Sequence, residues 1–336
     1  MTVNKLDELI ILGIETSCDE TAVAIVRGTN EVLANVIATQ EEIHQRFGGI
    51  VPELASRQHV KQITLLLQRA LQEAGLKLDA LDAIAVTQGP GLVGALLIGV
   101  MAAKTLSWVT GLPLIGVQHL AGHIYANHLK EPLTFPLVAL IVSGGHTELI
   151  YMREHLAFKR LGGTLDDAVG EAFDKVARLL GLPYPGGPSL EKLAEQGCEN
   201  YKLPRAWLGK DSLDFSFSGL KSSVMNLLRT EDCIKEDVAA SFQAAAIEVL
   251  VEKSISAIKE TGAKNLVLAG GVAANKKLRH ALRKRAQIEG VKLSLPQLSL
   301  CTDNAVMIAT VGTFLLAKGE VSDLRMNVEP NLKLSF

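Results

Sequence analysis

Residues 9–26 read LIILGIETSCDETAVAIV, two apolar runs separated by the polar segment Glu15-Thr16-Ser17-Cys18-Asp19-Glu20. The runs at 9–14 and 21–26 are rich in residues that favour strands. A second polar turn at 27–30 leads to another run of this kind at 32–39. The pattern predicts a three-stranded antiparallel meander.

Alternating helices and strands are expected after this meander. Apolar residues recur at helical spacing from 53 to 74, and Gly75 follows as a stop signal. Beyond it, short apolar runs alternate with longer helical patterns, which is the order of an α/β layer structure. The expected strands lie at 84–87 and 114–117, and the expected helices at 92–109 and 119–128.

The same order of elements then begins again. A strand, turn and strand fill 137–152, a third strand lies at 158–161, and a helix is expected at 166–180. The repeat predicts an α/β protein made by internal duplication. With 336 residues, the chain exceeds one average domain. We therefore expect domains at 1–133 and 134–336, with the last helix, at about 303–318, packing back toward the first domain.

Composition excludes several classes of protein. Hydrophobic residues make up 48% and charged residues 21%, which excludes wholesale disorder. The net charge is 34 − 36 = −2, which excludes a globally basic, histone-like binder of nucleic acid. Four scattered cysteines favour a reduced, cytoplasmic location over a disulfide framework. Residues 1–8 do not resemble a signal peptide, and the longest apolar stretch, at 92–103, is short for a membrane span, so we expect a soluble protein.

Three glycine- or serine-containing turns follow predicted strands. They lie at Ser17–Glu20, at Ser143-Gly144-Gly145, and at Gly270-Gly271, the last leading to Asn275. Backbone N–H groups in such turns can bind phosphate oxygens, and the Asn275 amide can contact a base or ribose. Each turn alone is compatible with an ordinary tight turn, but the three together favour a nucleotide site.

Two histidines have the spacing of metal ligands. His119 and His123 are four residues apart on a predicted helix, so both imidazoles lie on one face. Asp303, expected to open the last helix, is the candidate third ligand. Two imidazoles and a carboxylate suit iron or zinc, with open positions for substrate. The alternative is a pair of surface histidines, to which spacing alone gives about even odds.

The histidine pair also raises the possibility of a zinc protease. In the HExxH proteases, a glutamate after the first histidine is the general base. This chain has Leu120 at that position. The sequence therefore disfavours a protease.

Several charged residues have both a functional and a structural interpretation. Asp19 and Glu20 can accept a proton, bind a cation or hold an amine, or they can simply stabilise a turn. Asp174, on the predicted helix at 166–180, is a ligand contact or a solvated carboxylate. The six basic residues between 276 and 285 can contact a phosphate backbone or form a solvated helix face.

Six segments together resemble one family, the bacterial TsaD family of threonylcarbamoyl transferases, from about residue 12 to residue 314. The resemblance implies an actin/Hsp70-like (ASKHA) fold, in which two duplicated RNase H-like domains have a nucleotide cleft between them. The segments are GIETSCDET (13–21), GPGL (89–92), HLAGH (119–123), VSGGHT (142–147), FSFSGLK (215–221) and GGVAAN (270–275).

The resemblance also implies an activity and a set of site residues. The family transfers a threonylcarbamoyl group from threonylcarbamoyl-AMP to the N6 amine of adenosine 37 in tRNAs that read ANN codons. His119, His123 and Asp303 would bind Fe²⁺ or Zn²⁺. Glu191 stands where many relatives have Asp, which leaves its role less secure. The donor-nucleotide site would comprise Ile141, Val142, Ser143, Gly144, Gly145, Asp174, Gly187, Glu191 and Asn275.

Partners follow from the resemblance as well. It implies a TsaB-like paralogue as heterodimer mate, a TsaE-like ATPase, tRNA as substrate and a TsaC-type enzyme as the source of the donor. A homodimer is an option when the paralogue is absent, and no membrane association is expected.

For this reaction, Asp19 or Glu20 is the candidate group that removes the proton from the attacking amine. An ATPase or sugar kinase on the same fold, and a non-catalytic scaffold for tRNA processing, are the alternative functions.

Overall fold

The computed structural model describes residues 6–209, 211–230 and 232–334. Within these residues the chain divides into two compact units. Unit 1 contains the described residues of 1–43, 50–133 and 302–336. Unit 2 contains the described residues of 44–49 and 134–301.

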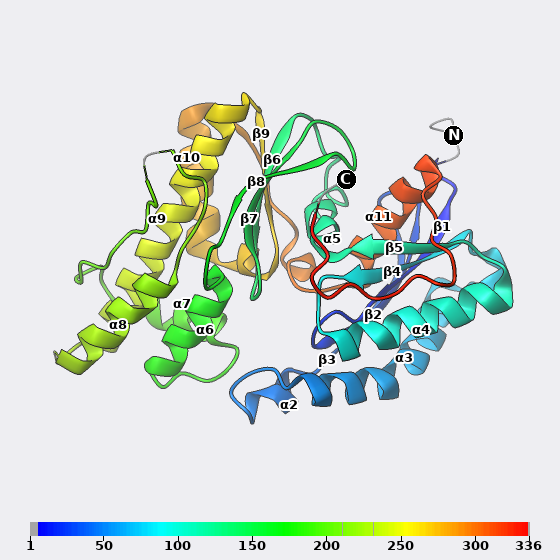
Figure 1. Ribbon diagram of the computed structural model, residues 1–336, viewed down its shortest axis with the longest axis horizontal. Coiled ribbons are helices and arrows are strands. Elements are labelled where there is room, and N and C mark those ends of the chain that lie inside the picture. The colour runs from blue at the N-terminus through cyan, green and yellow to red at the C-terminus, as the bar shows by residue number, and fades with distance from the viewer. Residues whose placement is uncertain (1–5, 210, 231, 335–336) are drawn as a thin grey trace. The chain divides into compact units, whose positions relative to one another are not determined.

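A five-stranded mixed sheet forms the centre of unit 1. Its strand order is β3-β2-β1-β4-β5, with the first three strands antiparallel and β4 and β5 added in parallel (Figure 1). The predicted meander is therefore confirmed. The strands are β1 (Ile10–Glu15), β2 (Glu20–Arg27), β3 (Glu31–Thr39), β4 (Ala83–Gly89) and β5 (Leu114–Gln118).

Unit 2 contains a second sheet with the same connectivity. Its order is β10-β9-β6-β7-β8, so the antiparallel meander β6-β7-β8 again has two parallel strands added beside its first strand. This correspondence confirms the internal duplication. The strands are β6 (Leu137–Val142), β7 (Thr147–Met152), β8 (Phe158–Gly163), β9 (Asn265–Ala269) and β10 (Lys292–Ser294).

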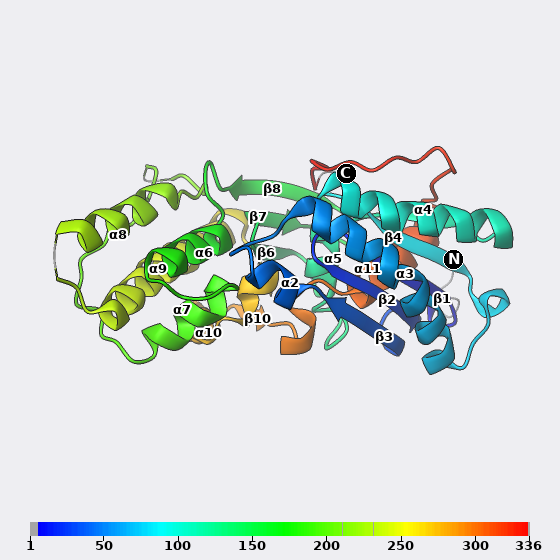
Figure 2. The same ribbon diagram turned by 90° about the horizontal axis from the view of Figure 1, so that it is seen from below.

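Helices cover both faces of the unit 1 sheet. Leu12 and Ile14 of β1 share an apolar core with α3 (Pro52–Ala74) and α4 (Val93–Thr110). Gly13 faces the other way and meets α11 (Ala305–Lys318). Because successive residues of a strand point to opposite faces, α11 lies on the face away from α3 and α4, as Figures 1 and 2 show. The short helices α2 (Glu41–Gln45) and α5 (His119–Tyr125) complete the set described here.

The helices of unit 2 differ from the expectation in three places. The helix expected at 166–180 begins only at Val169. The stretch at 184–217 is rich in proline and glycine, which predicts an irregular segment, but a helix begins near its start at Gly186. Apolar residues at helical spacing predict one helix at 272–287, but the structure has a 3₁₀ turn, η2 (Gly271–Ala274), followed by a separate helix capped by the side chain of Asn275. The helices are α6 (Val169–Leu179), α7 (Gly186–Ala194), α8 (Ser218–Thr230), α9 (Lys235–Thr261) and α10 (Lys276–Glu289).

Helix α4 matches the helix expected at 92–109 and extends beyond the apolar stretch at 92–103. Its 18 residues are long and apolar enough to cross a membrane by length and composition alone, which for one helix is weak evidence. It packs against α3 and β4 within unit 1. Its other side exposes Val93, Leu97, Met101 and Trp108. One side of α4 is therefore packed within unit 1, and the other side exposes a stripe of apolar side chains.

Two segments of unit 2 are joined through one carboxylate. Asp166 accepts hydrogen bonds from the backbone N–H of Phe217 and from the hydroxyls of Ser216 and Ser218 at the start of α8. Burial alone would raise the pKa of Asp166, but these hydrogen bonds outweigh it and hold the pKa below its ordinary value. Next to it, Asp167 pairs with Lys175 and Lys221.

The position of α11 depends on a missing side chain. A Cβ on Gly13 would overlap the carbonyl oxygen of Ala305 and crowd Ala309, both backbone neighbours in α11. Backbone atoms cannot rotate away as a long side chain can, so only glycine permits this approach.

Gly13→Ala is therefore expected to destabilise the protein by about 1–3 kcal/mol, through forced separation of α11 from β1. Gly219→Ala is the matched control, because a Cβ there meets nothing within 4 Å and alanine favours the helix. Urea unfolding of both variants measures the difference. Equal midpoints for the two variants would contradict the packing argument.

Asp166→Asn is expected to weaken the protein at neutral pH by about 1 kcal/mol through lost charge-assisted hydrogen bonds. Because the folded pKa lies below the unfolded one, this contribution is present above the unfolded pKa and disappears as the pH falls through the folded pKa. Wild-type stability should thus fall more steeply than that of the variant between about pH 5 and pH 3. Parallel pH dependences would contradict the assignment, and the exposed Asp211 of the same segment supplies a control Asp→Asn variant.

Candidate active site

Helix α5 presents two histidines on one side. It follows β5 directly, and the Gln118 side chain caps it by accepting a hydrogen bond from the backbone N–H of Ala121. His119 and His123 are both buried, at 8% and 1% exposure. Their ring centroids are 4.7 Å apart. The spacing thus places both imidazoles together, as expected.

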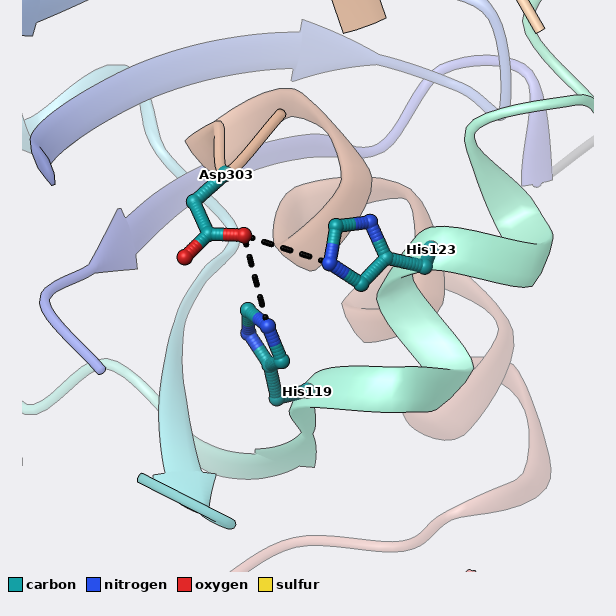
Figure 3. A group of neighbouring side chains, drawn as sticks. All are labelled: His119, His123 and Asp303. Atoms are coloured by element: carbon teal, nitrogen blue, oxygen red, sulfur yellow. Dashed lines mark ion pairs between the residues drawn. The ribbon is translucent and has the colours of Figure 1, made fainter. Parts of the chain in front are cut away.

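Asp303 approaches both imidazoles from the segment just before α11 (Figure 3). Its Oδ1 lies 3.4 Å from His119 Nε2 and 3.2 Å from His123 Nε2. The sequence expectation was wrong in one detail: Asn304 caps α11 by accepting from Met307 N–H, so Asp303 lies outside the helix. This leaves the Asp303 carboxylate available to the histidines rather than to the helix N-terminus.

A second glycine brings α5 and α11 together. A Cβ on Gly122 would lie 2.9 Å from Met307 and 3.0 Å from Ile308, both in α11. Gly122 lies between the two histidines in sequence. The absence of a side chain there lets the helix that carries the histidines lie against the helix that follows Asp303.

The three side chains can hold a metal ion. One ligand atom from each lies within 4.8 Å of the other two. Both ring nitrogens of His123 are buried without a hydrogen-bond partner among the described residues. Buried polar atoms normally have partners, so these nitrogens fit a ligand that the protein alone does not supply. Two imidazoles and one carboxylate would leave further coordination positions open.

The charges around His119 favour a cation. Burial lowers the pKa of His119, but Asp303 and Glu15 together raise it well above its ordinary value. Burial likewise raises the pKa of Asp303, and the nearby histidines outweigh it and keep the pKa well below its usual range. The site therefore concentrates negative charge around two imidazoles.

Glu15 and Ser17 lie directly behind His119. The Glu15 carboxylate is 2.9 Å from His119 Nδ1, and the Ser17 hydroxyl is 3.2 Å from the same nitrogen. Glu15 also accepts a hydrogen bond from the Thr87 hydroxyl at 2.5 Å. No local pattern in the sequence points to Glu15 or Thr87, because β1 and β4 meet only through the parallel pairing of the sheet.

Asp19 lies in the turn between β1 and β2, as expected, whereas Glu20 is already the first residue of β2. His59 of α3 holds this turn, with Nδ1 2.8 Å from the Thr21 hydroxyl and Nε2 2.9 Å from the Cys18 carbonyl oxygen. His59 was also missed by the sequence analysis, since nothing local links α3 to the turn. Burial, followed by Asp303 and Asp19, raises the pKa of Glu20 to about 10. A carboxyl with this pKa is protonated at neutral pH and donates a hydrogen bond rather than accepting a proton.

The predicted phosphate turn of unit 2 follows β6. Ile141 and Val142 are buried strand residues, and Ser143 closes the turn by accepting a hydrogen bond from His146 N–H. Gly144 and Gly145 are exposed, and a Cβ on either would meet nothing within 4 Å. Neither glycine is thus required by packing in unit 2.

The other predicted nucleotide residues are linked through helix N-termini. Asp174 of α6 accepts hydrogen bonds from the N–H groups of Gly186 and Gly187, at the start of α7. Glu191 of α7 accepts from Lys276 N–H at 2.6 Å, at the start of α10. Asn275 caps that same helix through its Oδ1. These four residues therefore have structural partners in unit 2. The side-chain oxygen of Asn275 already accepts a hydrogen bond from the Leu278 N–H.

Three of the six basic residues of α10 pair with carboxylates. Lys276 pairs with Glu195, Lys277 with Glu199, and Arg285 with Glu252 and Glu289. Arg279 donates to the backbone carbonyls of Ala273 and Pro296. Most of the cluster thus stabilises unit 2 itself.

The sequence-predicted residues therefore form two groups. His119, His123, Asp303, Asp19 and Glu20 belong to unit 1, and the predicted nucleotide residues belong to unit 2.

Comparison with known proteins gives the family to which these motifs correspond. Residues 31–310 match the model of the TsaD family, described as tRNA N6-adenosine threonylcarbamoyltransferase. The protein of that name from Bacillus subtilis (strain 168) is 58% identical over 339 residues, covering 99% of this chain and 98% of the relative. The protein of that name from Staphylococcus aureus (strain Newman) is 53% identical over 332 residues, covering 97% of each chain.

Solved structures of distant sequence share the fold. Full-length HypF aligns with a TM-score of 0.64 at 16% identity, covering 94% of this chain and 47% of HypF. Component A of (R)-2-hydroxyglutaryl-CoA dehydratase from Acidaminococcus fermentans aligns with a TM-score of 0.53 at 18% identity, covering 92% of this chain and 100% of the other. At such identities the likeness concerns the fold alone, and it confirms the expected ASKHA-type fold.

Proposed function

Since the chain belongs to the TsaD family of tRNA N6-adenosine threonylcarbamoyltransferases, we propose that His119, His123 and Asp303 hold the divalent metal that this family implies. The chain is a transferase that modifies tRNA at the N6 amine of adenosine. The observation that supports the metal assignment is that one ligand atom from each of the three side chains lies within 4.8 Å of the other two. The ring nitrogens of His123, which lack a hydrogen bond among the described residues, agree with it.

Fe²⁺ is the proposed ion, with Zn²⁺ as the alternative. A site of two imidazoles and one carboxylate with open positions is typical of non-haem Fe²⁺, and zinc enzymes use similar ligands. When bound, the ion supplies Lewis-acid polarisation of a donor oxygen. His119, His123 and Asp303 hold and orient it, while the buried setting limits the access of water.

The proposed donor is threonylcarbamoyl-AMP, bound over the strand ends and helix N-termini of unit 2. Gly144, Gly145 and Gly271 support this assignment, because each faces open space where a Cβ would stand. Exposed backbone N–H groups at such positions suit phosphate oxygens. Gly187 is proposed as a contact through its open Cα side, since its N–H donates to Asp174. Ile141, Val142, Ser143, Asp174, Glu191 and Asn275 complete the proposed contacts. In the reaction, the adenosine N6 attacks the carbamoyl carbon, the bond to the AMP phosphate breaks, and N6 loses a proton.

The proton from N6 needs an acceptor, and Asp19 is the favoured candidate. Glu20 has a pKa of about 10, raised first by burial and then by Asp303 and Asp19, so it suits donation of a hydrogen bond. The two adjacent carboxyls would then have different roles, one as acceptor and one as donor.

The domain division is proposed as 1–133 and 134–336, with the last helix returning to the first domain. Packing of α11 on β1 supports the return of this helix to the first domain.

The tRNA substrate follows from the family. As further partners we propose a TsaB-like paralogue, a TsaE-like ATPase and a TsaC-type enzyme that supplies the donor, with a homodimer when the paralogue is absent. The exposed apolar stripe of α4 offers surface for a protein partner, and the proposed location is the cytoplasm.

Nothing in the site favours the alternative functions. Leu120 occupies the position of the protease glutamate, and no described feature points to a kinase substrate. A non-catalytic scaffold predicts that loss of a metal ligand leaves modification intact.

His123→Ala is expected to lower transfer by more than about 100-fold, because loss of a direct ligand costs more than the 10–100-fold typical of outer contacts. The measurement mixes protein, partners, synthetic donor and unmodified tRNA, and mass spectrometry detects the modified nucleoside. A chelator should reproduce the loss in wild type. His280→Ala, at an exposed histidine of α10, should retain activity; modification by His123→Ala at the control level would support the scaffold instead.

Asp19→Asn is expected to slow single-turnover transfer by about 10²–10⁴-fold if it accepts the proton. Glu20→Gln keeps a hydrogen-bond donor and should cost less. Rapid-quench assays with saturating donor measure both rates. Full activity in both Asp19→Ala and Glu20→Ala would remove these residues from the mechanism.

A further inference from the structure

Glu15 is a fully buried carboxylate at the end of β1 with three hydrogen-bonding partners. Its Oε1 accepts from the backbone N–H of Ser17 at 2.5 Å. Its Oε2 accepts from the Thr87 hydroxyl and lies 2.9 Å from His119 Nδ1. Burying a carboxylate without hydrogen bonds raises the free energy of the folded protein, and the three partners of Glu15 offset this cost.

The geometry dictates which nitrogen of His119 carries a proton. An ionised carboxylate only accepts hydrogen bonds, so His119 Nδ1 must donate to Glu15. The Ser17 N–H and the Thr87 hydroxyl also donate to this carboxylate, which is the pattern of an ionised acceptor. A metal ion at Nε2 requires the neutral ring, and with its proton on Nδ1 the Nε2 lone pair points toward Asp303.

His123 provides the contrast. Its Nε2 lies 3.2 Å from Asp303 Oδ1, but its Nδ1 has no hydrogen-bond partner among the described residues. His119 is the more exposed of the two histidines, at 8% against 1%. Of the two rings, His119 thus has a carboxylate at Nδ1, whereas His123 has none there among the described residues.

We propose that Glu15 is a positioning residue that holds His119 in the tautomer and orientation needed to bind the metal ion. The inference rests on the proposed metal function. Carboxylates behind metal-binding histidines fix the ring and raise the basicity of the ligand nitrogen. Glu15 also places a second negative charge beside Asp303, which favours a divalent cation.

Glutamine cannot substitute for Glu15. With the amide oxygen toward His119, the NH₂ group meets the Ser17 N–H, and two donors face each other. With the amide reversed, the NH₂ group faces Nδ1 and favours a proton on Nε2, the nitrogen that would bind the metal. Either arrangement opposes metal binding while leaving the side-chain volume nearly unchanged.

The test is the affinity of the full chain for Zn²⁺, measured at fixed pH by competition with a chromophoric chelator after removal of bound metal. Glu15→Gln is expected to bind Zn²⁺ about 10- to 100-fold more weakly. Glu31→Gln, at an exposed glutamate of β3, is the matched control and should bind as wild type does. Thr87→Val removes another hydrogen bond to Glu15 but leaves the His119 contact, so it should lower the melting temperature of the metal-free protein with unchanged affinity.

The outcomes are distinguishable. Wild-type affinity in Glu15→Gln overturns the inference, as does equal weakening in Thr87→Val and Glu15→Gln, which indicates a purely structural role. If Glu15→Gln does not fold, Glu15→Asp decides, because it keeps the charge but withdraws the carboxylate: weaker binding supports the inference and wild-type binding overturns it. If wild type itself binds no Zn²⁺ or Fe²⁺ at His119 and His123, the proposed metal function fails instead.

Discussion

Asp303 reaches the two histidines because α11 lies closer to its neighbours than side chains would normally permit. Gly13 allows α11 to contact β1, and Gly122 allows α5 to contact α11. Interiors are packed too densely to absorb even one extra methyl group without displacement. The position of Asp303 is therefore set by two glycines, and the geometry of the proposed metal site follows from helix packing.

Electrostatics supports the proposal that a cation binds here. The buried Glu15 and the partly buried Asp303 both have pKa values below their ordinary range, whereas burial and acidic neighbours raise the pKa of Glu20. A divalent ion among these groups would relieve the repulsion and satisfy the ring nitrogens of His123. The same arrangement raises the pKa of Glu20 to about 10, at the start of β2. The packing of β1, α5 and α11 therefore determines which carboxyls are buried and how the two histidines face Asp303.

The sequence predicted what depends on local pattern. Runs rich in strand-favouring residues predicted the two meanders, and the four-residue spacing predicted the shared face of His119 and His123. Partners that meet through the sheet or through helix packing had no local signal, which is why Glu15 and His59 were missed. Helix starts were misjudged where a cap decides them: Asn304 and Asn275 begin α11 and α10, and Asp303 is left outside its helix. Helix α7 lies in a proline- and glycine-rich stretch, where Asp174 stabilises its first N–H groups.

The most direct test of this account is a crystal structure of the protein loaded with Fe²⁺ or Zn²⁺, with anomalous scattering recorded at the absorption edge of the metal. We expect a peak about 2.0–2.2 Å from His119 Nε2, His123 Nε2 and an Asp303 oxygen, with His119 Nδ1 still facing Glu15. A metal peak away from these three side chains, or a fully loaded crystal with none beside them, would contradict the account.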